Sequence, residues 1–189
     1  RRQRQMCIRD SSGTFDGDGH TISGLYDDTG RTYAGFVGEL SGSGTIKNLG
    51  IVDSWIRGYH VGGVCGESAG TITHCYFSGT IETKVGSAGG ICGVSSGTIA
   101  NSYNMGLVNG IAASGSMGGV CGENTGTITN SYNTGSVVAG TYCTGDSCGG
   151  VCGRNEGTIR NVFNSGTLSH DSDRVYLGGL CGTNTSGAT

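Results

Sequence analysis

Residues 118–137 read GGVCGENTGTITNSYNTGSV. Nearly the same stretch occurs at 62–81 (GGVCGESAGTITHCYFSGTI), at 89–108 (GGICGVSSGTIANSYNMGLV) and at 149–168 (GGVCGRNEGTIRNVFNSGTL). The chain ends on half of a further copy, GGLCGTNTSGAT, at 178–189. A unit of this length cannot bury a core of its own, so a fixed repeat of it predicts an architecture of stacked units.

The copies align on one column near the cysteine of the repeat, whose members are Val37, Cys65, Cys92, Cys121, Cys152 and Cys181. The successive spacings in this column are 28, 27, 29, 31 and 29 residues. Each unit holds three short runs of alternating apolar residues separated by Gly, Asn and Ser, which is the pattern of strands rather than helices. The sequence therefore predicts an all-β fold, a right-handed parallel β-solenoid with coils of about 27–31 residues and three short strands per coil.

Composition narrows the class of protein. The 189 residues include 40 glycines and no proline, and charged residues make up 13% with a net charge of −3. This balance favours neither nucleic acid nor an anionic membrane as a partner, and no apolar run is long enough for membrane insertion within this segment. We expect residues 1–12 to be an N-terminal arm or the edge of the expressed piece. Residues 13–189 should form a single solenoid domain, a fragment of a longer protein whose neighbouring repeats or domains are its partners.

Two asparagine columns accompany the repeat. The first contains Asn48, Asn101, Asn130 and Asn161, with His74 as the exception, and the second contains Asn104, Asn133 and Asn164. Asparagine tolerates left-handed backbone and can hydrogen-bond along a stack, so these columns predict solenoid corners. Sugar binding is the functional alternative for an exposed asparagine column.

The cysteine column predicts buried free thiols, because the first unit fills the same position with valine and free cysteine behaves as a small apolar residue. Cys143 and Cys148 differ, since both belong to the insertion TYCTGDSCGG. A disulfide could close this loop, which would fit an extracellular, oxidising setting. Cys148 also shares a column with Val61, Ala88 and Met117, so a buried thiol remains open for it.

The unit GGVCG…GTITNSYNTG resembles the GLUG repeat (Gly-Leu-any-Gly), which occurs in tandem in large bacterial surface and adhesin-like proteins. The non-catalytic region of the immunoglobulin A1 metallopeptidases is one example. The segment GTFDGDGHTISGLY at 13–26 also resembles the sequence that precedes such repeats. The resemblance covers roughly residues 13–187 and implies a β-solenoid at the bacterial surface or in a secreted protein. It implies no particular catalytic site.

No catalytic, cofactor or metal site is predicted from the residues. DGDGH at 16–20 and DSD at 171–173 lack the closing glutamate of a calcium loop and are expected to be turns. Glu39, Glu67 and Glu123 share a column that Val94 and Arg154 interrupt, which indicates a solvated edge. A column of threonines (Thr45, Thr71, Thr98, Thr127 and Thr158) leaves ice binding as a remote alternative.

The sequence thus predicts a non-catalytic, extracellular module that serves as a stalk or as an adhesin-like binder of a host glycan or protein. Recognition should lie in the segments that vary between coils, at 82–87, 109–116, 138–147 and 169–176. The candidate contact residues there are Tyr142, Asp146, Asp173 and Arg174. The alternative is a glycan-active β-helix enzyme, a lyase or hydrolase, which would need clustered carboxylates such as Asp27, Asp28 and Asp53.

Overall fold

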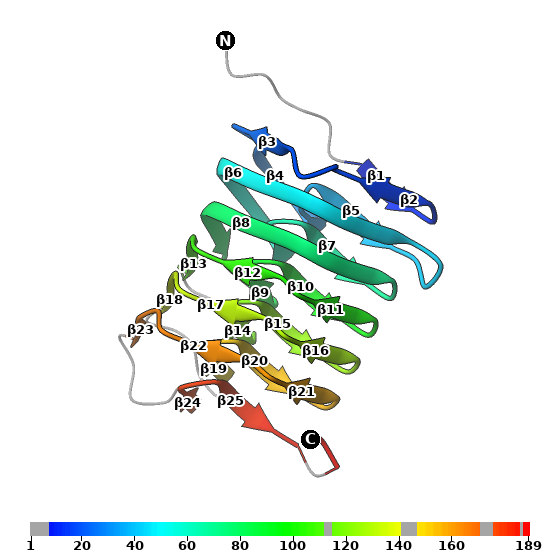
Figure 1. The fold of residues 1–189 in the computed structure, drawn as a ribbon. Helices are drawn as coiled ribbons and strands as arrows, with labels where there is room; N and C mark the ends of the chain where they lie inside the picture. The colour runs from blue at the N-terminus through cyan, green and yellow to red at the C-terminus, as the bar shows by residue number, and fades with distance from the viewer. Residues whose placement is uncertain (1–7, 112–114, 141–146, 171–175, 186) are drawn as a thin grey trace.

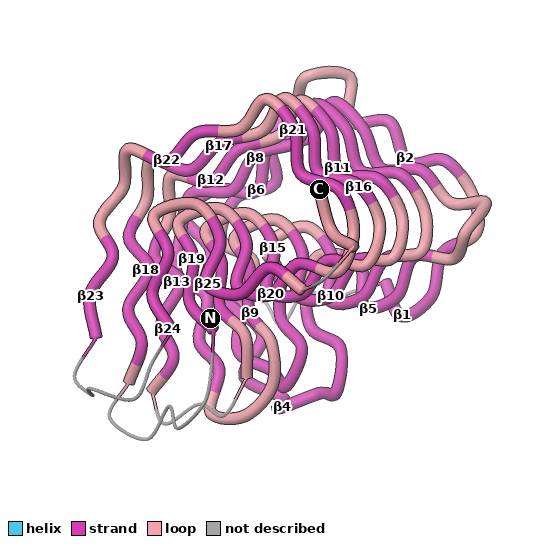
Figure 2. Tube along the Cα trace, turned by 90° about the horizontal axis from the view of Figure 1, so that it is seen from below, coloured by secondary structure: helices cyan, strands magenta, loops and turns pink. Residues whose placement is uncertain are grey.

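The computed structural model describes residues 8–111, 115–140, 147–170, 176–185 and 187–189, and the regular structure in these ranges is entirely strand. Parallel strands stack along one axis into a solenoid, with the two ends of the chain at opposite ends of the stack (Figure 1). Seen from the C-terminal end, each coil runs counter-clockwise as the chain approaches the viewer, which is right-handed winding (Figure 2). The described residues include no helix long and apolar enough to cross a membrane.

The first sheet contains seven parallel strands, one from each coil. They are β1 (Ile8–Ser11), β5 (Val37–Leu40), β7 (Cys65–Ser68), β10 (Cys92–Ser95), β15 (Cys121–Asn124), β20 (Cys152–Asn155) and β25 (Cys181–Asn184). The register joins the members of the predicted cysteine column, so that Cys92 pairs with Cys65 on one side and with Cys121 on the other. Ile8 of β1 pairs with Val37, and the paired stack therefore begins before Gly13.

The second sheet has eighteen strands and covers the remaining sides of the coil (Figure 2). The early coils contribute β2 (Thr14–Asp16), β3 (Thr21–Ser23), β4 (Tyr26–Ala34), β6 (Thr45–Gly62), β8 (Thr71–Thr83) and β9 (Ala88–Gly89). The middle coils contribute β11 (Thr98–Ala100), β12 (Tyr103–Asn104), β13 (Leu107–Gly110), β14 (Met117–Gly118), β16 (Thr127–Thr129), β17 (Tyr132–Asn133), β18 (Ser136–Ala139) and β19 (Ser147–Gly149). The last are β21 (Thr158–Arg160), β22 (Phe163–Asn164), β23 (Leu168–His170) and β24 (Tyr176–Gly178).

A left-handed residue divides the run that follows each GTI step. Asn48, Asn101, Asn130 and Asn161 have φ between 48° and 54°, and His74 has φ 53°, as expected for residues that tolerate this region. In the middle and late coils the left-handed residue separates two short strands, such as β11 and β12. These coils therefore contain five short strands where three runs were expected.

The same residue decides which side chains enter the core. Simple alternation from the buried Ile99 would turn residues 101 and 103 inward. The left-handed Asn101 is instead exposed and resets the alternation, so Ser102 and Asn104 are buried and Tyr103 faces outward. The tyrosines of the repeat therefore lie on the surface, although they belong to an apolar run of the sequence.

The core is a set of columns that continue from coil to coil. Ile72, Ile99 and Ile128 form one column, and Ile81, Val108 and Val137 form another, all of them 0–1% exposed. The paired glycines that precede each cysteine border these columns. A Cβ on Gly119 would overlap the Asn133 side chain, and one on Gly90 would overlap that of Asn104. The GG step is thus required because the core side chain of the same coil packs against bare backbone.

Two ladders of asparagine amides run through the interior. Asn104 Nδ2 donates to Asn133 Oδ1 at 2.8 Å, and Asn133 Nδ2 donates to Asn164 Oδ1 at 2.9 Å. A second ladder joins Asn124, Asn155 and Asn184 through two bonds of 2.7 Å. Because buried amides must be hydrogen-bonded, each ladder favours the in-register stack over any slipped pairing. The hydrogen bonding expected of the second asparagine column is confirmed, but it lies inside the core.

Candidate functional site

The thiol column lies in the interior of the stack. Cys65, Cys92, Cys121 and Cys152 are 0% exposed, and each Sγ lies 2.9–3.2 Å from the carbonyl oxygen two residues further on. Burial raises the pKa of the Cys65 and Cys121 thiols well above the ordinary value. A buried, protonated thiol is a poor nucleophile and a poor metal ligand. Cys65 pairs with Val37, so this position of the coil accepts an apolar side chain, and the four buried cysteines are structural.

The insertion between β18 and β19 is described only in part. Cys143, Tyr142 and Asp146 lie outside the described residues, as do Asp173 and Arg174 of the next insertion. Cys148 is buried and pairs with Met117 of the previous coil, in the apolar column that the sequence indicates. The proposed bond between Cys143 and Cys148 stays a prediction.

The strands that flank the variable segments lie together at one corner of the stack. The variable segments are residues 84–87, 111–116, 140–146 and 171–175, each between one strand of the second sheet and the next in sequence. The flanking strands pair in register from coil to coil, so the variable segments begin and end on neighbouring rungs. We call this edge of the solenoid the variable corner.

The first variable segment, with neighbouring strands, lines a cavity of about 220 Å³ formed by Gly30, Arg57, Gly58, Tyr59, Lys84 and Val85. The Tyr59 and Val85 side chains are 43% and 42% exposed. Arg57 Nη1 lies 3.2 Å from Asp28 Oδ1. The cavity thus combines apolar surface with two cationic side chains, a mixture that suits an oxygen-rich ligand with an apolar face.

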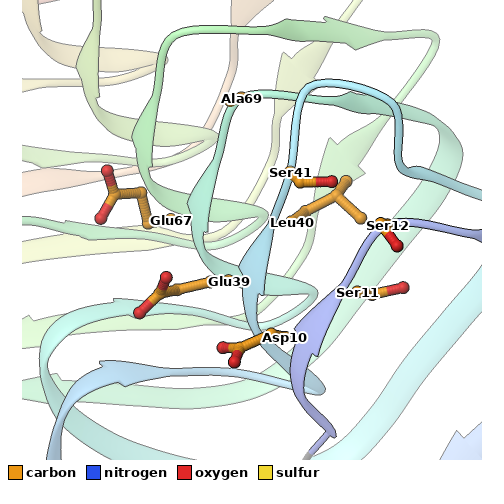
Figure 3. Close-up of a pocket in the computed structure, with 8 residues that line it drawn as sticks. All are labelled: Asp10, Ser11, Ser12, Glu39, Leu40, Ser41, Glu67 and Ala69. Carbon is orange, nitrogen blue, oxygen red and sulfur yellow. The ribbon is translucent and has the colours of Figure 1, made fainter.

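A row of carboxylates runs along the outer side of the first sheet. Asp10 pairs with Glu39, and Glu39 pairs with Glu67, so three acidic side chains occupy consecutive rungs. Figure 3 shows them beside a cavity of about 290 Å³. Sequence reasoning found Glu39 and Glu67 but missed Asp10, because the first coil lacks the glycine-cysteine signature. The row is interrupted at Val94, as the sequence predicts.

Two of the column's glutamates have protein partners at the neighbouring edge. A hydrogen bond with Glu67 raises the pKa of Tyr33 to about 12, and Ser87 Oγ donates to Glu123 Oε1 at 2.6 Å. The Ser87 amide donates to His60 Nδ1 at 3.3 Å, and burial lowers the pKa of His60. In the described ranges, no group of three or more His, Cys, Asp or Glu side chains is arranged to hold a metal ion.

The carboxylates named for the enzyme alternative have separate surroundings. Asp27 is buried, and its Oδ1 accepts hydrogen bonds from the amide and hydroxyl of Thr29 at 2.9 and 2.6 Å. Asp28 is paired with Arg57, and Asp53 is an exposed left-handed residue with φ 49°. Asp27 and Asp28 are thus engaged by Thr29 and Arg57.

The DGDGH stretch forms a turn. The His20 amide donates to the Gly17 carbonyl at 2.8 Å, and Asp18 and Gly19 both have positive φ. Asp16 accepts from Asn48 Nδ2 at 3.0 Å and lies 3.1 Å from Lys47 Nζ. The bond from Asn48, with smaller contributions from the Asp18 amide and Lys47, lowers the pKa of Asp16 to about 2. The Asp16 carboxylate thus interacts with the neighbouring Asn48 and Lys47 side chains.

The outward aromatic residues form a ladder on the second sheet. The rings of Tyr76, Tyr103, Tyr132 and Phe163 stack with centroid separations of 5.2, 4.8 and 4.7 Å and interplanar angles of 1–6°. Tyr76 covers Gly50, where a Cβ would overlap its ring. Beside the ladder runs the exposed row of left-handed residues His74, Asn101, Asn130 and Asn161. The sequence predicts the asparagine column, but not that it lies beside an aromatic ladder on the surface.

Comparison with known proteins agrees with this architecture. Residues 57–82 match the family model of the GLUG motif. Over 72 residues, or 37% of the chain, the sequence is 49% identical to halomucin from Haloquadratum walsbyi, of which this match covers 1%. The structure is similar to that of a candidate immunoglobulin A1 protease from Bacteroides ovatus, with a TM-score of 0.68 and 22% identity over 88% of this chain and 55% of that one. The chain thus spans only part of either relative, and the second likeness concerns the fold.

Proposed function

We propose that this chain, which carries the GLUG motif, is a non-catalytic module of a bacterial surface or secreted protein. It acts as a stalk that binds a glycan or a host protein through its variable corner. The observation that carries the proposal is the contrast between a constant interior and a changing edge. The columns of the core repeat in register through every full coil, whereas length and sequence change mainly at the variable corner.

Stacking makes such a module stiff and extensible. Each coil contacts chiefly its neighbours, through continuous sheets and through the amide ladders. A structure of this kind grows by adding coils without changing the packing of the existing ones. It can therefore hold an attached domain or a binding surface at a distance from its anchor.

The variable corner supplies the chemical diversity that recognition needs. Its first segment brings Lys84 and Val85 to the cavity beside Tyr59 and Arg57. Exposed tyrosine and arginine are enriched where proteins bind partners, because they combine contact area with directed hydrogen bonds. The third and fourth segments contribute Tyr142, Asp146, Asp173 and Arg174 from the sequence. A glycan or a host protein is the partner class that this mixture suits.

The relatives support an extracellular location for the parent protein. Halomucin is named as a mucin, and the Bacteroides ovatus protein is named for the proteolysis of an immunoglobulin. Both names refer to molecules that function outside the cell. A low share of charged residues and a repeated, proline-free sequence also fit a long structural segment.

A binding screen with loop-deletion variants tests the proposal. The intact chain is screened against an array of host glycans and against host surface proteins, and one variant lacks residues 141–146 while another lacks 171–175. Binding should be lost or weakened in at least one variant while the circular dichroism spectrum stays that of β structure. Lys84→Ala should weaken any binding at the first segment, whereas Lys47→Ala, which removes a lysine paired with Asp16 at another edge, should not.

The enzyme alternative is tested on the same samples. A reducing-sugar assay and an assay for unsaturated products should show no turnover of any polysaccharide that binds. Turnover that disappears on replacement of a single Asp or Glu would contradict the proposal. Equal binding by the intact chain and by both deletion variants would also contradict it, since recognition would then lie elsewhere.

A further inference from the structure

A second surface of the solenoid, on the front of the second sheet in Figure 1, repeats instead of varying. It consists of the aromatic ladder Tyr76, Tyr103, Tyr132 and Phe163 together with the left-handed row His74, Asn101, Asn130 and Asn161. We call it the amide–aromatic strip. It crosses β12, β17 and β22, away from the variable corner (Figures 1 and 2).

The strip presents the same groups once per coil. Neighbouring rings are 4.7–5.2 Å apart and nearly parallel, so their faces cover one another, and the tyrosines remain only half-buried. The left-handed backbone fixes the asparagines in equivalent positions beside them. A surface with this regular spacing suits a ligand that is itself a polymer of regular units. One sugar of an extended β-linked glycan rises by about the distance between strands.

The two middle coils of the strip are uncharged, whereas Arg160 precedes Asn161 at its last coil. Residues 98–110 and 127–139, which cover the strands β11–β13 and β16–β18, contain no Asp, Glu, Lys, Arg or His. Partial burial raises the pKa of Tyr103, and adjacent Tyr132 and Tyr76 act in the same direction, so its hydroxyl stays protonated at neutral pH. A polyanion such as nucleic acid would find no cationic groups along these coils. The surface fits a neutral ligand.

Hydrogen-bonding capacity remains available on the strip. Asn161 Nδ2 donates to Asn130 Oδ1 at 3.2 Å, but within the described ranges the Nδ2 atoms of Asn130 and Asn101 donate to no protein atom. The hydroxyls of Tyr103 and Tyr132 lie in the same rungs, and Met105 beside Tyr103 is 46% exposed. Amides and hydroxyls that both donate and accept match sugar hydroxyls, and the exposed Met105 thioether offers apolar contact to the C–H groups of a sugar.

We propose that the amide–aromatic strip binds one extended chain of a neutral polysaccharide, lying along the axis of the solenoid. This site extends the proposed surface function but does not depend on the variable corner. Each coil contributes one equivalent subsite, so affinity should grow with the number of sugars until the chain spans the strip. An oligosaccharide of four or more units should therefore bind more tightly than a disaccharide of the same sugar.

The test uses two double variants that leave the backbone unchanged. Asn101→Gly with Asn130→Gly removes two amides at positions where φ is 49° and 48°, a region that glycine adopts freely. Tyr103→Phe with Tyr132→Phe removes two hydroxyls and keeps the stack. Binding is measured by co-sedimentation with cellulose, chitin and insoluble xylan, and by affinity electrophoresis in soluble neutral glucan and mannan. Alginate and heparin serve as charged probes.

The intact chain should bind at least one neutral polysaccharide and neither charged one. Each double variant should bind at least about fivefold more weakly, the effect of losing two hydrogen bonds, with an unchanged melting temperature for the phenylalanine pair. The control variant Lys47→Ala, which removes a lysine paired with Asp16, should bind normally. The proposal is overturned if no neutral polysaccharide binds, or if binding survives both double variants. Loss of binding only in the corner variants would overturn it while supporting the corner as the binding site. Thermal hysteresis in freezing solutions without polysaccharide binding would instead assign the strip to ice.

Discussion

Asn133→Asp should be strongly destabilising, although it changes only one group of a buried side chain. Asn133 is 0% exposed and makes four side-chain hydrogen bonds. Its Oδ1 accepts from Asn104 Nδ2 at 2.8 Å and from the Gly135 amide at 3.1 Å, and its Nδ2 donates to Asn164 Oδ1 at 2.9 Å and to the Gly135 carbonyl at 3.0 Å. A carboxylate keeps both accepted bonds and loses both donated ones.

The structure sets the size of the effect. Two acceptor oxygens, Asn164 Oδ1 and the Gly135 carbonyl, each lose the bond from Asn133 and face a carboxylate oxygen instead, although Asn164 Oδ1 still accepts from the Gly166 amide at 3.1 Å. The loss of a buried partner costs about 1–3 kcal/mol for each group. The expected loss in the free energy of unfolding is therefore about 2–6 kcal/mol at pH 7. For comparison, the whole stability of a domain is about 5–15 kcal/mol. The matched control is Asn161→Asp, the same substitution in the exposed row, which should change stability by no more than about 0.5 kcal/mol.

The sign of the pH dependence provides a second measurement. Burial and the two facing oxygens should raise the pKa of the introduced carboxyl above its unfolded value, although the two remaining donors offset part of this. The deficit should then be smallest below the unfolded pKa of about 3.9 and should grow as the pH rises toward the folded pKa. Denaturant unfolding followed by circular dichroism between pH 3 and 7 measures both effects. Equal losses for Asn133→Asp and Asn161→Asp, or a deficit that shrinks with rising pH, would refute the buried amide ladder.

Other expectations concern the core, the thiols and one tyrosine. Ile128→Asp should unfold or strongly destabilise the chain, because it places an unpaired charge at a position that is 0% exposed; a folded variant with normal stability in denaturant would disprove the solenoid core. Cys92, Cys121 and Cys152 should resist alkylation until denaturant is added, and rapid labelling of the native protein, detected by mass spectrometry, would place the thiols at the surface. Cys121→Val should lower the free energy of unfolding only a little, since Val37 occupies the same column. Ser95→Asn should raise the free energy of unfolding, because Asn124 Oδ1 is a buried acceptor without a protein donor and Ser95 is its neighbour in register. If Ser95→Asn is less stable than Ser95→Ala, the amide ladder of Asn124, Asn155 and Asn184 has no room for another amide. In a spectrophotometric titration one tyrosine should ionise near pH 12, and both Glu67→Gln and Tyr33→Phe should remove this late component; a titration unchanged by either variant would exclude the Tyr33–Glu67 bond.

The repeat by itself determined the architecture of this protein. A period of 27–31 residues with alternating short runs can bury a core only by stacking. This predicts the parallel solenoid, the register of Cys92 with Cys121 and the burial of the thiols. The left-handed asparagines were predictable as well, because Asn is one of the few residues that adopts this backbone without great strain.

The tertiary structure alone decided which columns face the core and which face solvent. The alternation of side chains is a local rule, and the left-handed Asn101 reverses it between Ile99 and Tyr103. That reversal turns the polar Asn104 inward, where the Gly106 backbone of its own coil and the Asn133 amide of the next coil hydrogen-bond it. It turns the tyrosines outward into a ladder. The sequence indicates that asparagine can adopt the left-handed turn. Which side chains point inward after the turn depends on packing between coils, and no single repeat contains that information.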